Sequence, residues 1–355
     1  MPDPTPPDPA TLATARSLPK VVLHDHLDGG LRPATLLELL QRRGLPAPAD
    51  DLPALQAWFE DRAHAGSLTE YLRGFALTVA AMATPEALSR VAFEAAMDVH
   101  ADGCVLAEFR IAPLLFEPFG IGGDAAVEAL LDGLARARRT NGMPTGLIVC
   151  AMRQERPERV ALAADLALRH RGRGVVAFDL AGPEAGHPAT DFAALLGRVQ
   201  LQGLPLTLHA GEADIGQRVV EAARLGARRV GHGVHFADLL ARAEGPSLAA
   251  DLRAQGLHFE VCPTSNVHTG AAASLATHPI RRLWDAGLSL SFHPDNRLIS
   301  CVGMSEEAAN LHREAGFSWH DLRRMGLAAA RASFLPEGDK AAALAYLEAW
   351  AGPPA

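Results

Sequence analysis

The chain has 355 residues, 48% of them hydrophobic, and a formal net charge of −8. Its acidic residues form no block and its arginines are scattered, so the composition favours neither a membrane surface nor nucleic acid as a partner, and a small-molecule substrate is expected. The cysteines form no C-x-x-C pair, which argues against a disulfide framework and a thiolate zinc site and fits a cytoplasmic location. They are Cys104, Cys150, Cys262 and Cys301.

The chain begins with the proline-rich stretch "MPDPTPPDPATLATARSLP". It carries aspartates and prolines where a secretory signal would need a basic start and an apolar stretch. We therefore expect residues 1–15 to form a mobile tail and residues 16–355 to form a single domain.

Eight short apolar runs follow, each bounded by glycine, proline or charge and separated by longer helical stretches rich in alanine and leucine. The runs are 20–24, 104–112, 146–152, 174–182, 204–212, 228–233, 257–263 and 288–295. Eight strands that alternate with helices predict a TIM (β/α)8 barrel. Periodicity does not show closure, so an open sheet stays an alternative.

The first two runs are separated by about 80 residues, far more than an ordinary loop, which predicts a helical insertion over about 33–100. One helix should start at Ser67 and present an apolar stripe formed by Leu72, Phe75, Val79 and Met82. The stripe either packs on the barrel or forms a lid over a pocket. The residues after the last run predict a C-terminal helical extension.

Ionisable side chains gather at the C-terminal ends of the runs, where barrel enzymes build their active sites. His24 and His26 alternate along an extended chain and so point to the same side, as two ligands of one metal ion would. Histidines also have many structural uses, so the pair alone leaves both readings open. Two further strand ends supply His209 and Asp295, and this set of nitrogen and oxygen donors suits zinc.

The lysines limit the number of metal ions. Barrel hydrolases with two bridged metals commonly use a carboxylated lysine at a strand end. The chain has only Lys20, which opens the first strand, and Lys340, near the C-terminus. Neither position can bridge two ions, so one zinc ion is expected.

Two more residues suit acid–base chemistry. Glu212 follows His209 by three residues, where it could act as a general acid beside the metal. The alternative is a glutamate that stabilises a helix N-terminus. His232 lies between two glycines and could hold an attacking water, or it could be a packed histidine at a strand end.

These residues lie in five segments that resemble, in order and approximate spacing, the motifs of the adenosine deaminase family within the amidohydrolase superfamily. The segments are "PKVVLHDHLDGGLRPATL", "FDLAGPE", "TLHAGE", "RVGHG" and "SFHPDNRL". The resemblance runs from about Lys20 to the C-terminal helices. It implies a zinc-dependent enzyme of purine salvage or catabolism that converts adenosine and 2'-deoxyadenosine to inosine and 2'-deoxyinosine, with release of ammonia.

The same resemblance assigns the metal and catalytic roles. The implied zinc ligands are His24, His26, His209 and Asp295. Glu212 would protonate the purine nitrogen N1, and His232 would lie beside the zinc-bound water.

Three residues would bind the substrate. The resemblance implies that Asp28 holds the ribose 5'-hydroxyl and that the backbone N–H of Gly182 meets purine N3. For Asp28 the alternative is an aspartate that orients the turn through the two following glycines. Asn296 replaces the aspartate that many family members have at the position facing purine N7. An asparagine can donate to N7 without needing an extra proton, so we expect the role to survive.

Alternatives remain for one ligand and for the function. His293 lies two residues before Asp295 and could compete with it for the metal. The enzyme could act on another aminopurine, either adenine or a 5'-modified adenosine. The chain could also be a binding protein that kept the barrel and lost catalysis, although its full set of candidate residues argues against this.

Overall fold

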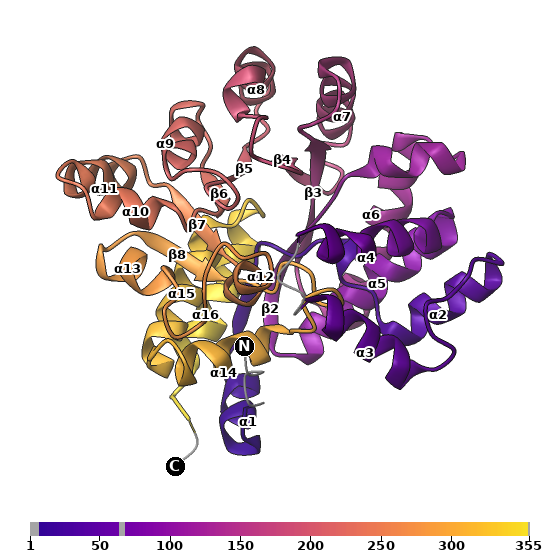
Figure 1. Cartoon of the computed structure of the whole chain (residues 1–355), viewed down its shortest axis with the longest axis horizontal. Coiled ribbons are helices and arrows are strands. Elements are labelled where there is room, and N and C mark those ends of the chain that lie inside the picture. Colours follow the sequence, from indigo (N-terminus) through magenta and orange to yellow (C-terminus); the bar gives the residue numbers. More distant parts are fainter. Residues whose placement is uncertain (1–6, 64–67, 354–355) are drawn as a thin grey trace.

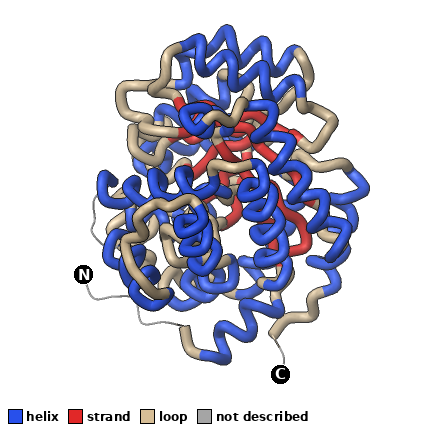
Figure 2. Tube along the Cα trace, turned by 90° about the vertical axis from the view of Figure 1, so that its right-hand side faces the viewer, coloured by secondary structure: helices blue, strands red, loops and turns tan. Residues whose placement is uncertain are grey.

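The structure, a computed structural model, describes residues 7–63 and 68–353. Its strands are all parallel and lie at the centre of the molecule, with helices around them (Figures 1 and 2). They are β1 (Lys20–Val22), β2 (Cys104–Ile111), β3 (Thr145–Met152), β4 (Val175–Ala181), β5 (Thr207–Ala210), β6 (Arg229–His232), β7 (His258–Val261) and β8 (Ser289–Phe292). Each of the eight runs in the sequence therefore contains a strand.

The strands form two sheets, in the orders β1-β2-β3-β4 and β5-β6-β7-β8. Isolated parallel bridges join the sheets at both seams. Phe178 pairs with Leu206 between β4 and β5, and Asp25 pairs with Asp295 just after β1 and β8. The strands thus follow one another around a ring, and the predicted TIM barrel is confirmed.

The helical insertion after β1 is also confirmed. It contains α2 (Pro33–Arg42), α3 (Leu52–Ala63), α4 (Leu68–Met82) and α5 (Pro85–Ala101). Ser67, the expected start of one helix, lies outside the described residues, as does the side chain of Leu72. Val79 and Met82 are buried in the main hydrophobic cluster, and α4 also contacts the turn after His26. The described part of the stripe therefore packs on the barrel, close to its mouth.

Further helices connect the strands. They are α6 (Gly123–Asn141), α7 (Pro157–Arg169), α8 (Ala193–Leu201), α9 (Gln217–Arg224), α10 (Phe236–Leu240), α11 (Gly245–Ala254), α12 (Pro263–His268) and α13 (Ile280–Asp285). The described residues also form the 3-10 helices η1 (Leu27–Gly29), η2 (Pro113–Phe119) and η3 (Ala189–Phe192). In the described part of the chain no helix has the length and apolar character that a membrane span requires.

The C-terminal extension consists of α14 (Met304–Arg313), α15 (Trp319–Ala332) and α16 (Glu337–Ala349). α15 packs against β1 and β8, and α16 packs against β2. Their alanines and leucines bury Val21, Leu23 and Leu106 in a second hydrophobic cluster. This cluster supports the strands from outside and leaves their C-terminal ends for the site.

The predicted tail over residues 1–15 is wrong for its last part, because α1 (Pro9–Ser17) is a helix. Asp8 caps it by accepting hydrogen bonds from the N–H groups of Ala10 and Thr11, and Pro9 occupies its first turn, where a missing N–H costs nothing. Ala15 is fully buried. Lys20 donates to the carbonyls at the end of the helix. The prolines of this segment suggest a tail, but the Asp8 cap and Pro9 at the first turn start a helix.

Candidate active site

The loops after β1 and β8, together with the end of β5, bring the predicted metal ligands together. Nε2 of His26 lies 3.3 Å from Nε2 of His209, and Oδ1 of Asp295 lies 3.2 Å from Nε2 of His24 and 3.4 Å from Nε2 of His26. His24, His26 and His209 offer nitrogens that all lie within 4.8 Å of one another. The structure therefore places all four predicted ligands around one point.

Their protonation states suit a cation. Burial, with the nearby charge of Arg110, lowers the pKa of His24 to about 4, and burial also lowers the pKa of His26 well below its usual value. Burial alone would raise the pKa of Asp295, but its close contacts with His24 and the neighbouring histidines hold it well below the usual range. Both imidazoles are thus neutral and the carboxyl is ionised, which are the forms that bind metals.

Two buried carboxylates orient the imidazoles. Nδ1 of His24 lies 3.0 Å from Glu260, and Nδ1 of His209 lies 2.9 Å from Asp179. With Nδ1–H donated to a carboxylate, Nε2 keeps its lone pair for a metal. Arg110 bonds to both carboxylates and so ties them to each other. His24 Nε2 is buried and has no hydrogen-bond partner among the residues that the structure describes, so the residues present fit a zinc ion.

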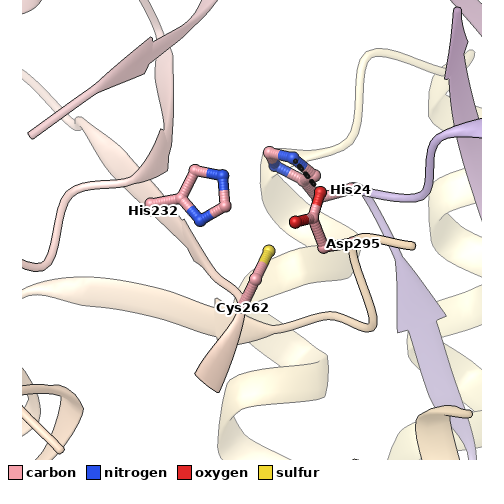
Figure 3. A group of neighbouring side chains, drawn as sticks. All are labelled: His24, His232, Cys262 and Asp295. Carbon is pink, nitrogen blue, oxygen red and sulfur yellow. Dashed lines mark ion pairs between the residues drawn. The ribbon is translucent and has the colours of Figure 1, made fainter. Parts of the chain in front are cut away.

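Figure 3 shows a second group of possible donors, in which Cys262 and His232 face His24 and Asp295. Burial, together with the charge of Asp295, raises the pKa of the Cys262 thiol well above its usual value. The thiol Sγ lies 3.7 Å from the carbonyl of Glu260. The sequence argued against thiolate ligands and did not place a cysteine here. The raised pKa favours the neutral thiol, which is the weaker ligand.

Glu212 and His232 form a pair beside this cluster. Nε2 of His232 lies 3.4 Å from Oε2 of Glu212. The side-chain amide of Asn266 lies 3.0 Å from Nδ1 of His232 and orients the ring, so that Nε2 faces the Glu212 carboxyl group. Among the described residues other than glycine, positive φ angles occur at His232 (63°), Asp295 (61°) and Cys301 (50°). Two of these three strained positions are predicted site residues.

Asp28 departs from the extended path expected of it, because the chain turns into the 3-10 helix η1 after His26. Its side chain is still buried, and Oδ1 has no hydrogen-bond partner among the described residues. Burial, with the charge of Asp295, raises the pKa of Asp28 to about 7. The carboxyl group can therefore accept a hydroxyl from a ligand, even though the alternation argument fails at this position.

The other two predicted substrate residues also lie at strand ends. Gly182 follows β4 with φ of +90°, a conformation that favours glycine, and a Cβ atom there would also lie 2.4 Å from Oε1 of Gln154. Asn296 is buried and lies against Gly29, where a Cβ atom would come within 2.1 Å of Oδ1 of Asn296. The structure thus places Asn296 against the loop that carries Asp28.

His293 does not join the candidate metal ligands in the described structure. Its Nδ1 accepts a hydrogen bond from the N–H of Leu23 at 3.2 Å, and its Nε2 lies 2.7 Å from the hydroxyl of Ser291. A neutral imidazole with both nitrogens engaged offers no lone pair to a metal. Lys20 also stays away from the site, because its Nζ donates to the carbonyls of Ala15 and Leu18.

Several residues that support the site were not assigned a role by the sequence motifs. They are Arg110, Asp179, Glu184, Glu260, Cys262, Ser265 and Asn266. One available signal was a charged residue inside an apolar run, as at Arg110 in "LAEFRIA" and Glu260 in "HFEVC". In a buried strand such a residue needs a partner of opposite charge.

A parallel barrel with this set of strand-end residues defines a hydrolase of the amidohydrolase type. The chain belongs to the adenosine deaminase family, whose members hydrolyse C–N bonds, because the family model described as adenosine deaminase matches residues 19–350. A protein named adenosine deaminase from Mycobacterium bovis is 44% identical over 338 residues, which covers 92% of each chain.

Solved structures agree with this assignment. An amidohydrolase from Burkholderia ambifaria with bound zinc superposes with a TM-score of 0.84 at 25% identity, covering 98% of this chain and 94% of that one. An N6-mAMP deaminase from Arabidopsis gives a TM-score of 0.82 at 25% identity, covering 95% and 99%. The family expected from the sequence motifs is confirmed.

Proposed function

We propose that the protein binds one zinc ion through His24, His26, His209 and Asp295 and hydrolyses adenosine and 2'-deoxyadenosine to inosine and 2'-deoxyinosine. The observation that carries the proposal is the convergence of these four donors beside the Glu212–His232 pair. The zinc-containing structure from Burkholderia ambifaria supports the choice of metal. Bound there, zinc would lower the pKa of a water molecule from about 16 to about 7 and so supply a nucleophile at neutral pH.

The residues of the chain account for the remaining chemistry. Glu212 donates a proton to purine N1, which makes carbon C6 more electrophilic. His232, 3.4 Å from Glu212, holds the attacking water and takes up its proton. The new C6–O bond replaces the C6–N bond. The amino group takes the proton that His232 received from the water and leaves as ammonia, and the remaining hydroxyl proton returns to Glu212. The N–H of Gly182 meets N3, and Asn296 donates to N7.

Asp28 favours a nucleoside over a nucleotide. Its buried carboxyl can accept a 5'-hydroxyl, whereas a 5'-phosphate would place like charges side by side. The Arabidopsis relative is named for a methylated nucleotide, so this part of the substrate must be tested directly.

The test is to incubate the purified protein with adenosine, 2'-deoxyadenosine, adenine and adenosine 5'-monophosphate and to follow loss of the amino group by ultraviolet difference. We expect the two nucleosides to react, a chelator to stop the reaction and added zinc to restore it. Glu212→Gln should keep zinc and lose turnover. Preference for adenine or the nucleotide would refute the substrate assignment, and a zinc-loaded protein inert to all four would refute catalysis.

A further inference from the structure

The candidate site lies across a seam in the barrel. Strands β4 and β5 belong to different sheets, and one parallel bridge, Phe178 with Leu206, joins them in the part of the chain that the structure describes. Figure 1 shows the two strands next to each other where the sheets meet. Gly182 follows β4 and Glu212 follows β5, so both lie beyond this bridge, on opposite sides of the seam.

Beyond the bridge, side chains connect the two strands. The carboxylate of Asp179 accepts the N–H of His209 at 3.2 Å. Nη2 of Arg153 donates to the carbonyl of Leu180 at 2.7 Å and to that of His209 at 2.6 Å. Both connecting side chains are buried. They stabilise the seam near the metal ligand His209.

Glu184 makes the outermost connection. Its Oε1 accepts the N–H of Gly211 at 2.6 Å, and its Oε2 accepts the N–H groups of Glu212 and Ala213, each at 3.0 Å. Only 3% of Glu184 is exposed. A carboxylate that accepts three successive N–H groups forms charge-assisted bonds, which are stronger than bonds between neutral groups.

These bonds link the backbones on the two sides of the proposed substrate. Glu184 lies two residues after Gly182, and the N–H groups that it binds include that of Glu212 itself. Under the proposed function, Gly182 meets N3 and Glu212 protonates N1, which are atoms of the same six-membered ring. The separation of the two loops therefore has to match one rigid ring.

We propose that Glu184 is a positioning residue that fixes the gap between the N–H of Gly182 and the carboxyl of Glu212, and so aligns the acid with purine N1. The inference rests on the proposed function, because it needs the purine ring between these two groups. Glu184 acts through the loop 211–213 and touches neither substrate nor metal, since its two oxygens are engaged by backbone N–H groups.

Glu184→Gln tests this role. The glutamine has a single acceptor oxygen, and its amide NH2 would face N–H groups, so the loop 211–213 loses part of its anchor. The matched control is Glu155→Gln, the same substitution in the loop after β3, where Glu155 pairs with Arg159 at 3.2 Å. Glu184→Asp keeps the charge and shortens the side chain by one methylene, so it cannot reach all three N–H groups. If Glu184→Gln does not fold, Glu184→Asp tests the positioning role in its place.

The measurements are zinc content, kcat for adenosine, and the inhibition constants of inosine and 3-deazainosine, which lacks N3. We expect full zinc content, a fall in kcat of about 10- to 100-fold for Glu184→Gln, and no change for Glu155→Gln. Inhibition by inosine should weaken more than inhibition by 3-deazainosine, because only inosine uses the Gly182 contact.

Two results would overturn the inference: a wild-type kcat in both Glu184 variants, or equal weakening of the two inhibitors, which would mean a general structural role. A wild-type enzyme that is inert to adenosine refutes the proposed function instead, so the two failures can be told apart.

Discussion

Nδ1 of His24 lies 3.0 Å from Oε2 of Glu260, and neither side chain has any exposed surface. Burial alone would raise the pKa of Glu260, but Arg110 and Arg229 outweigh this effect and hold the pKa well below its usual range. An ionised carboxylate that accepts from Nδ1–H fixes the tautomer of His24 and turns its Nε2 toward the other ligands.

Glu260→Gln should weaken zinc binding, because the neutral amide no longer favours the required tautomer. We expect a loss of about 10- to 100-fold in zinc affinity, measured by competition with a chelator on folded protein. Glu94→Gln is the control, since Glu94 pairs with Arg90 at 2.8 Å in α5, away from the site. Equal zinc affinity in the two variants would show that Glu260 only balances the buried arginines.

Asp28→Ala should reduce turnover and leave zinc in place. If the carboxyl holds the 5'-hydroxyl, its removal should lower kcat/KM for adenosine by about 10- to 100-fold. The loss should be much smaller for 5'-deoxyadenosine, which lacks that hydroxyl. His26→Ala, in contrast, should lose zinc. Zinc loss from Asp28→Ala would show that Asp28 helps to hold the metal and does not serve the sugar alone.

Asn296→Asp should make activity depend on pH. Purine N7 is an acceptor, so an aspartic acid facing it must keep its proton to donate, whereas the native amide donates in any case. We expect kcat/KM of the variant, relative to wild type, to fall as pH rises. The check is a pH profile of kcat/KM for both proteins with adenosine. Superimposable profiles would show that residue 296 does not donate to N7.

The strands, and the residues at their ends that form the candidate site, could be predicted from the sequence for one physical reason. Parallel strands end on the same face of a barrel, so residues at successive strand ends meet in space. This argument brought His24, His26, His209 and Asp295 to one place without any knowledge of distances, and the structure has them close together. It failed at Asp28, because periodicity does not reveal where an extended segment gives way to a 3-10 turn.

The supporting residues were harder to predict because their roles depend on partners far away in the chain. Glu260 meets His24 from a strand 236 residues later, and Glu184 meets backbone N–H groups that carry no signal in the side-chain pattern. For α1 the capping residue Asp8 was visible in the sequence, but the neighbouring prolines led to the prediction of a tail instead of a helix. The fold and the grouping of the proposed metal ligands therefore follow from local pattern, while the orienting contacts require the structure.

The last prediction concerns Glu307 of α14, which holds the start of α12. Its Oε1 accepts the N–H of Thr264 at 2.9 Å, and its Oε2 bonds to the Thr264 hydroxyl. The next two residues, Ser265 and Asn266, bond to Asp295 and His232. Burial raises the pKa of Glu307 from 4.5 to about 7. Between these values the folded protein keeps a proton that the unfolded chain has lost.

This difference makes the protein less stable as pH rises from about 4.5 to about 7, because stability falls wherever the folded state binds more protons. Glu307→Gln cannot lose a proton and should lack this part of the pH dependence. Relative to wild type, its free energy of unfolding should improve by up to about 2.5 kcal/mol between about pH 5 and about pH 8. Urea unfolding of the metal-free proteins at both pH values measures it. If the two proteins change in parallel, Glu307 is ionised throughout, and the start of α12 is then held by a carboxylate rather than by a neutral acid.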